Sequence, residues 1–83
     1  MASDYKIIPG KRFTEAMRNL DNPAREAAGK RMEKILVNPL QGKPLRGEAG
    51  WYSERFLCYR IIYKVEGDQL TFVKLGKRDD VYR

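Results

Sequence analysis

The carboxyl-terminal half of the chain has the pattern of three consecutive β-strands, and this pattern constrains the fold more than any other feature. The runs are rich in aromatic and β-branched residues: Trp51–Phe56, Tyr59–Glu66 and Leu70–Leu75. Gly67-Asp68 marks a tight turn between the last two. Successive side chains point to opposite faces of a strand. One face of the middle strand therefore carries Tyr59, Ile61, Tyr63 and Val65, and the other carries Arg60, Ile62 and Lys64.

The amino-terminal half has a helical period instead. A short β-type run over residues 4–8 ends at Pro9-Gly10. The apolar residues that follow recur at i, i+3, i+4 and i+7, as on one side of a helix: Phe13, Ala16, Met17 and Leu20. A second helix is expected to have Asn22 as its N-cap and Pro23 in its first position, and to end by about Val37.

Few residues separate the two helices, so they should form an antiparallel hairpin. Arg31 lies at the edge of the apolar side of the second helix, where it must snorkel or find a partner. Residues 43–47 are expected to form a loop, and Gly76 to break the last strand. The order β-α-α-β-β-β predicts an α+β fold, a helical hairpin packed on a small, mostly antiparallel sheet, in one domain over residues 1–83.

The composition excludes several kinds of catalytic and metal-binding site. The chain of 83 residues has one cysteine, Cys58, and no histidine. This excludes an internal disulfide, a cysteine-cluster metal site and every mechanism that needs a histidine base. Asp79-Asp80, the only adjacent acid pair, reads as a solvated turn, so we expect no metal and no cofactor.

The net charge of +6 favours a polyanionic partner, either a nucleic acid or an acidic protein. The sequence contains no run of about 18 apolar residues that could span a membrane, and no signal-peptide pattern near its start. We therefore expect a cytoplasmic protein.

Arg60 is the strongest candidate for function because it interrupts an otherwise apolar strand. Two interpretations stay open: its stem packs while its head remains in solvent, or its guanidinium is held on the sheet to clamp a phosphate. Arg78 and Tyr82 follow the last strand. If these three groups converge, arginine can stabilise phosphate charge and the tyrosine can exchange a proton, which suits metal-free RNA cleavage by the 2′-hydroxyl.

Trp51 also allows two interpretations, since its ring could stack on a base or belong to the core or its rim.

Three segments carry a family resemblance: Leu45-Arg46-Gly47, the run from Tyr52 to Tyr63 with its Tyr59-Arg60-Ile-Ile-Tyr63 motif, and Leu75-Gly76-Lys77-Arg78-Asp-Asp-Val-Tyr82. They resemble the carboxyl-terminal half of the RelE/ParE toxin superfamily, whose element order is also the one predicted above. The resemblance covers the whole chain in topology and about 40 residues in motif.

The resemblance implies a toxin of a type II toxin–antitoxin pair. The RelE branch suggests a ribosome-dependent mRNA endonuclease that leaves a 2′,3′-cyclic phosphate, with Arg60, Arg78 and Tyr82 as catalytic residues. RNA contacts are expected from four basic residues: Lys43, Arg46, Arg55 and Lys77. The expected partners are an acidic antitoxin, the ribosome and mRNA.

The chain also departs from the family pattern. The strand before the hairpin has Trp51, Tyr52 and Ser53 where some RelE proteins have lysines, so no lysine base can be assigned. Leu57-Cys58 occupies the hairpin tip, where these residues are a poor turn pair and predict a wider hairpin. Two alternatives remain open: a ParE-like inhibitor that binds DNA gyrase without cutting RNA, and an inactive member of the superfamily.

Overall fold

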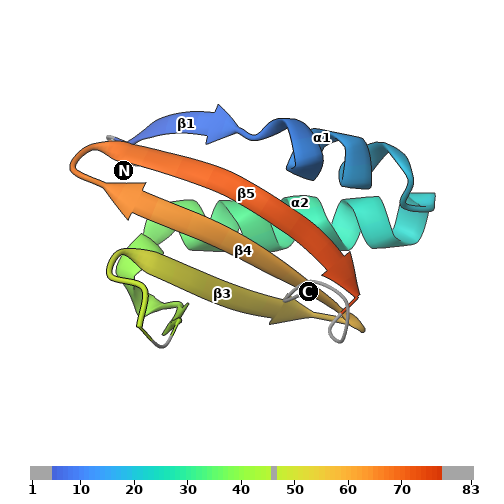
Figure 1. Ribbon diagram of the computed structural model, residues 1–83. Coiled ribbons are helices and arrows are strands. Elements are labelled where there is room, and N and C mark those ends of the chain that lie inside the picture. The colour runs from blue at the N-terminus through green and yellow to red at the C-terminus, as the bar shows by residue number, and fades with distance from the viewer. Residues whose placement is uncertain (1–4, 46, 78–83) are drawn as a thin grey trace.

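The computed structural model describes residues 5–45 and 47–77, in which a helix pair packs on a five-stranded mixed sheet (Figure 1). The amino-terminal elements are β1 (Lys6–Pro9), α1 (Lys11–Arg18) and α2 (Asn22–Val37). A 3₁₀ turn (Pro39–Gln41) leads to the four remaining strands: β2 (Lys43–Pro44), β3 (Trp51–Phe56), β4 (Tyr59–Glu66) and β5 (Gln69–Lys77). The predicted α+β architecture and element order are confirmed.

The sheet order is β1-β5-β4-β3-β2. The strands β2 to β5 pair antiparallel, whereas β1 runs parallel to β5 at the edge of the sheet. Strand β4 is therefore central, with β3 and β5 hydrogen-bonded on either side of it. This places the Tyr59–Glu66 segment, which carries Arg60, in the middle of the sheet.

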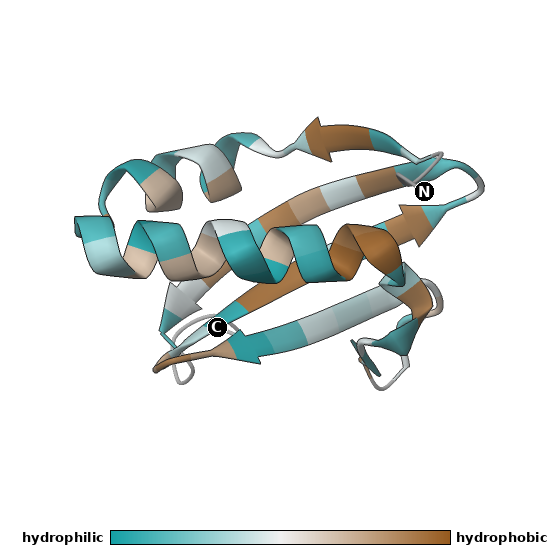
Figure 2. Ribbon diagram, turned by 180° about the vertical axis from the view of Figure 1, so that it is seen from behind, coloured by the Kyte–Doolittle hydropathy of each residue, from teal (hydrophilic) through white to brown (hydrophobic). Residues whose placement is uncertain are grey.

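The core lies between the sheet and the helices, and it uses the apolar residues that the periodicity selects. On the helical side, Phe13, Ala28 and Ile35 are buried, and Phe13 stacks on Phe72 of β5 with ring centroids 5.1 Å apart. From β4, Ile61 and Tyr63 are both 0% exposed. The view from behind shows α2 lying across this face of the sheet (Figure 2). The face of β4 that carries Tyr59, Ile61, Tyr63 and Val65 is thus the one that packs against the helices.

Several local predictions need correction. The N-cap of α2 is Asp21 rather than Asn22, because the Asp21 carboxylate accepts a hydrogen bond from the Ala24 amide at 3.0 Å. Residues 43–47 are not all loop, since Lys43 and Pro44 pair with Ser53 and Tyr52 as strand β2. Pro9, expected to end the first strand, is itself the last residue of β1.

The last two corrections concern β5 and the β3–β4 hairpin. Gly76 does not break β5, which continues to Lys77 with Gly76 opposite Arg60. The hairpin is tight rather than wide, because only Leu57 and Cys58 separate the two strands. Leu57 achieves this with a positive φ of 50°, the conformation that glycine normally supplies in such turns.

Candidate functional site: a basic face of the sheet

Arg60 stands on the face of the sheet opposite the helices. In register it lies across from Arg55 on β3 and from Gly76 on β5. Its Nη1 donates a hydrogen bond to the Ser53 hydroxyl at 3.1 Å. Ser53 is 2% exposed and is the one buried polar residue of residues 5–45 and 47–77. The guanidinium is therefore anchored on the sheet rather than simply extended into solvent, and Gly76 adds no side chain beside it.

A basic pocket surrounds this arginine. Its volume is about 270 Å³, and its lining residues come from β2, β3 and β4: Lys43, Ser53, Glu54, Arg55 and Arg60. Strand β2 is what brings Lys43 into the pocket, since Lys43 pairs directly with Ser53. The Glu54 carboxylate is engaged by Arg31 of α2 at 3.0 Å, so the acidic member of the set is already paired. The predicted edge position of Arg31 is explained by this ion pair.

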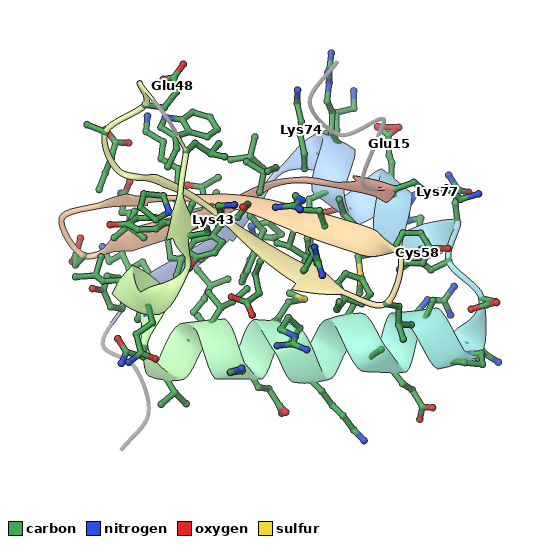
Figure 3. The ribbon with its side chains drawn as sticks, turned by 90° about the horizontal axis from the view of Figure 1, so that it is seen from below. Glu15, Lys43, Glu48, Cys58, Lys74 and Lys77 are labelled. Atoms are coloured by element: carbon green, nitrogen blue, oxygen red, sulfur yellow. The ribbon has the colours of Figure 1, made fainter. Side chains whose placement is uncertain are left out.

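Two further lysines extend the positive charge along the same face. Lys64 lies two residues beyond Ile62 on β4 and forms an ion pair with Glu66 at 3.2 Å, which offsets part of its charge. Lys74 pairs with Ile62 across the β4–β5 ladder. Figure 3, viewed along the sheet, shows Lys74 pointing away from α2. Together with the pocket they form what we call the basic face: Lys43, Arg55, Arg60, Lys64 and Lys74.

This arrangement can bind and stabilise an anion, and its one carboxylate among residues 5–45 and 47–77, Glu54, is engaged by Arg31. Guanidinium groups remain protonated, so Arg55 and Arg60 can stabilise charge on a phosphate without acting as bases. Tyr63, the nearest buried phenol on β4, faces the helices and donates to the Pro39 carbonyl at 2.6 Å. Burial raises the pKa of Tyr63 to about 12, with a smaller contribution from the Glu54 charge. It is a structural group that stays neutral.

The predicted site residues separate into three groups. Arg60, Arg55 and Lys43 come together in the pocket. Lys77 lies outside it, at the exposed end of β5 opposite Tyr59. Arg46, Arg78 and Tyr82 lie outside the described residues. The position of Asp79-Asp80 is also outside them.

Sequence reasoning missed Ser53 and underused Lys64 and Lys74. From the sequence, Ser53 was noted only because some RelE proteins have a lysine at this position and this chain does not. The available signal was alternation, because Trp51, Ser53 and Arg55 share one face of β3 by their spacing of two. What the sequence could not supply was the register that pairs this face with Arg60.

Across the described ranges 5–45 and 47–77, no group of three or more cysteine or carboxylate side chains is placed to hold a metal ion. In the same part of the chain, no helix combines the length and apolar character needed to cross a membrane.

Comparison with known proteins agrees with the resemblance in the sequence. A family model described as the ParE toxin of type II toxin–antitoxin system, parDE, matches residues 11–82. No curated protein matches the chain.

Solved structures similar to this chain include an isolated RelE toxin and chains of toxin–antitoxin complexes. The isolated E. coli RelE toxin is 26% identical, with a TM-score of 0.80, and the match covers 94% of this chain and 90% of that one. A chain of the intact E. coli RelBE toxin–antitoxin complex is 25% identical, with a TM-score of 0.78 over 88% of this chain and 95% of that one. A chain of the Mycobacterium tuberculosis RelBE2 complex shares the fold at 24% identity, with a TM-score of 0.77. The match covers 89% of this chain and 98% of that one.

Proposed function

The chain belongs to the ParE toxin family within the RelE/ParE superfamily of type II toxin–antitoxin systems, and we propose that it is a ribosome-dependent mRNA endonuclease. The observation that carries the proposal is the anchored arginine in its basic pocket. Arg60 is held by the buried Ser53, and Lys43 and Arg55 line the same 270 Å³ space. A fixed guanidinium among cations is what stabilisation of a pentacovalent phosphate requires.

The proposed reaction uses the RNA itself as the nucleophile. The 2′-oxygen attacks the adjacent phosphorus, a 2′-O–P bond forms, and the P–O5′ bond breaks to leave a 2′,3′-cyclic phosphate. The 5′-oxygen leaves as a hydroxyl, so one proton leaves the 2′-hydroxyl and one reaches the leaving group. Arg60 stabilises the charge on the non-bridging phosphate oxygens. This chemistry needs no metal, and DNA, which lacks the 2′-hydroxyl, cannot undergo it.

The remaining assignments rest on the family resemblance. Arg78 is proposed as a second arginine on the phosphate, and Tyr82 as a group that exchanges a proton or hydrogen-bonds the attacking oxygen. Contacts with RNA phosphates are proposed for four basic residues: Lys43, Arg46, Arg55 and Lys77. Ribosomal RNA would meet the same positive charge, which suits binding in a ribosomal site.

A cognate antitoxin is the second proposed partner. Similar RelE chains occur in complexes with antitoxins, including the intact E. coli RelBE complex. On this chain, a groove of about 380 Å³ between α2 and the β3–β4 hairpin combines basic and apolar lining residues: Ala27, Lys30, Arg31, Lys34, Phe56 and Leu57. This lining suits an acidic segment with apolar anchors, which would fold as it binds.

The direct test is cleavage of mRNA on purified ribosomes by the wild type, Arg60→Ala and Lys30→Ala. Lys30 is an exposed lysine on α2 that lines the proposed antitoxin groove and not the phosphate pocket, so its loss removes the same charge outside the proposed catalytic site. We expect cleavage by Arg60→Ala to fall roughly 10²–10³-fold, and Lys30→Ala to cleave like the wild type. Equal cleavage by all three proteins would remove Arg60 from the mechanism.

A second candidate function follows from the family model, whose printed name is ParE rather than RelE. A ParE-like protein would inhibit DNA gyrase by binding and leave RNA intact. A supercoiling assay beside the cleavage assay separates the two. Inhibition of supercoiling without cleavage of ribosome-bound mRNA would favour this candidate, whereas absence of both activities in a folded protein would indicate an inactive member.

A further inference from the structure

Trp51 belongs to the basic face rather than to the core. It is the first residue of β3, and it pairs with Lys64 across the ladder as Ser53 pairs with Ile62 and Arg55 with Arg60. Alternation therefore puts the indole on the same side of the sheet as the pocket. The hydrophobic core between the sheet and the helices does not include Trp51, and Trp51 is not among the half-buried apolar residues that pack against that core. The structure does not support a core position for Trp51, whereas a half-buried position at the rim of the core and a stacking role both agree with it.

The ring is held in place on this face. The Lys64 ammonium lies 5.5 Å from the centroid of the indole, within the range of a cation–π contact. The backbone of Trp51 is fixed on both sides, because its amide donates to the Glu48 carbonyl and its carbonyl accepts from the Leu45 amide. The indole is half-buried and has a lysine against it, so its orientation on this face is set while part of the ring stays accessible to solvent.

The distance from the indole to the pocket suits a nucleic acid strand. Trp51 and Arg55 are four residues apart along β3, which is about 13 Å at the rise of a β-strand. Lys64 lies at one end of this path, and Lys43, Arg55 and Arg60 lie at the other. An aromatic ring beside a positively charged track is the pattern by which proteins bind single strands, where bases stack and phosphates meet cations.

We propose that Trp51 is a stacking platform for one base of single-stranded RNA whose phosphate, a short way along the same strand, occupies the pocket of Lys43, Arg55 and Arg60. The inference deepens the proposed function, on which it rests, by naming a base contact outside the reacting phosphate. A protein ligand is less well supported, because the indole lies on the same face of the sheet as the phosphate pocket and in register with it. The Lys64 ammonium beside the ring also forms an ion pair with Glu66 at 3.2 Å, so most of the positive charge on this face lies at the pocket.

The chain offers a direct probe, since Trp51 is the only tryptophan among its 83 residues. Its fluorescence is to be followed while a short uridine-rich RNA is added at low salt, with binding measured in parallel by the anisotropy of a dye on the RNA. A second oligonucleotide has the same number of phosphates but no bases. We expect the RNA to quench Trp51, and the abasic strand to bind more weakly without quenching.

Substitutions separate stacking from charge. Trp51→Leu keeps an apolar side chain without a ring, and we expect it to bind the RNA roughly 5–100-fold more weakly, the range found for loss of one stacked base. Trp51→Tyr keeps a ring and should recover most of the affinity. For the abasic strand, all three proteins should bind alike.

The outcomes also separate this inference from the proposed function. Binding by anisotropy without quenching, equal affinities of wild type and Trp51→Leu, or no RNA binding at all would each overturn the stacking platform. None of these results alters the ribosomal assay of Arg60→Ala, on which the nuclease depends. Conversely, quenching and loss of affinity in a protein that cuts no ribosome-bound mRNA would retain the platform and reject the nuclease.

Discussion

The two faces of β4 differ sharply although their residues alternate along one strand. On the helix side, Ile61 and Tyr63 are fully buried in the core. On the other side, Arg60 and Lys64 lie among cations from three further strands. Ile62 is the exception on this second face, since it is apolar and 3% exposed. We therefore expect the strand to contribute to stability mainly through the helix side and, under the proposed function, to binding through the charged residues of the other side. Neighbouring substitutions should therefore have effects of different kinds.

The largest expected effect is on stability, at Ile61. Replacing Ile61 by alanine removes apolar atoms from a site that is 0% exposed, and we expect unfolding to become easier by about 2–5 kcal/mol. Urea denaturation followed by circular dichroism measures this. Arg60→Ala is the matched control one residue away, with an expected cost of about 1 kcal/mol. Equal losses at the two positions would show that the faces do not divide as described.

The second effect concerns Tyr63 and alkaline pH. Its pKa is about 12 in the folded protein and 10.0 in the unfolded chain, because burial penalises the phenolate. Between these values the unfolded state gives up its proton first, so stability falls as pH rises from about 10 to 12. The loss amounts to about 2–3 kcal/mol once both states are ionised.

Tyr63→Phe tests this because it has no proton to lose. The variant should be less stable near neutral pH by about 1 kcal/mol, since the Pro39 carbonyl loses its donor. Its stability should then fall less steeply than that of the wild type above pH 10. Titration of the other groups is common to both proteins, and parallel curves would show that Tyr63 has an ordinary pKa.

Ser53 provides a smaller effect on the basic face, and on activity rather than folding. Removing its hydroxyl by Ser53→Ala frees the Arg60 guanidinium from a 3.1 Å hydrogen bond. A small displacement of a group that contacts the reacting phosphate lowers the rate steeply, so we expect cleavage to fall roughly ten-fold. The loss should appear in kcat, and Ser53→Thr, which retains a hydroxyl, should restore it. Unchanged kcat in Ser53→Ala would assign Ser53 to packing alone.

The smallest effect lies at the hairpin tip, away from both faces. Leu57 has a φ of 50° and is 70% exposed, so it has backbone strain without compensating burial. Leu57→Gly should raise stability by about 0.5–1 kcal/mol, the strain relieved less the entropy that glycine loses on folding. Leu57→Ala retains a Cβ and serves as the control. Loss of stability in Leu57→Gly would mean that the exposed side chain makes a contribution to the fold.

Local pattern predicted most of the fold. The stripe of Phe13, Ala16 and Met17 in the first helix, the end of the second helix at Val37 and the bounds of β3 and β4 follow from signals within each segment. The prediction was wrong for Leu20, which lies beyond the end of α1 at Arg18 but is still buried. The features that were missed depend on pairing between distant segments. Strand β2 is only two residues long and exists because Lys43 and Pro44 pair with β3, and Gly76 stays in β5 because it has Arg60 beside it.

For the candidate site too, local pattern was predictable from the sequence and pairing between distant segments was not. Arg60 could be chosen from the sequence because a charge interrupts an apolar strand, and Arg55 because it occupies a basic position of the motif. The hydrogen bond between Arg60 and Ser53 could not be predicted in this way. Seven residues separate them along the chain, and only the hairpin register brings them together. The tight turn at Leu57-Cys58 sets that register, and its residues argue against such a turn.

The most direct test of the account measures two quantities on two neighbouring variants, Arg60→Ala and Ile61→Val. The quantities are the cleavage rate of ribosome-bound mRNA per folded molecule and the free energy of unfolding. We expect Arg60→Ala to lose roughly 10²–10³-fold in rate with little loss of stability, and Ile61→Val to lose about 1 kcal/mol of stability while cleaving like the wild type. Wild-type cleavage by Arg60→Ala, or a loss of rate in both variants that follows their stability, would contradict the division of β4 into a structural face and a functional face.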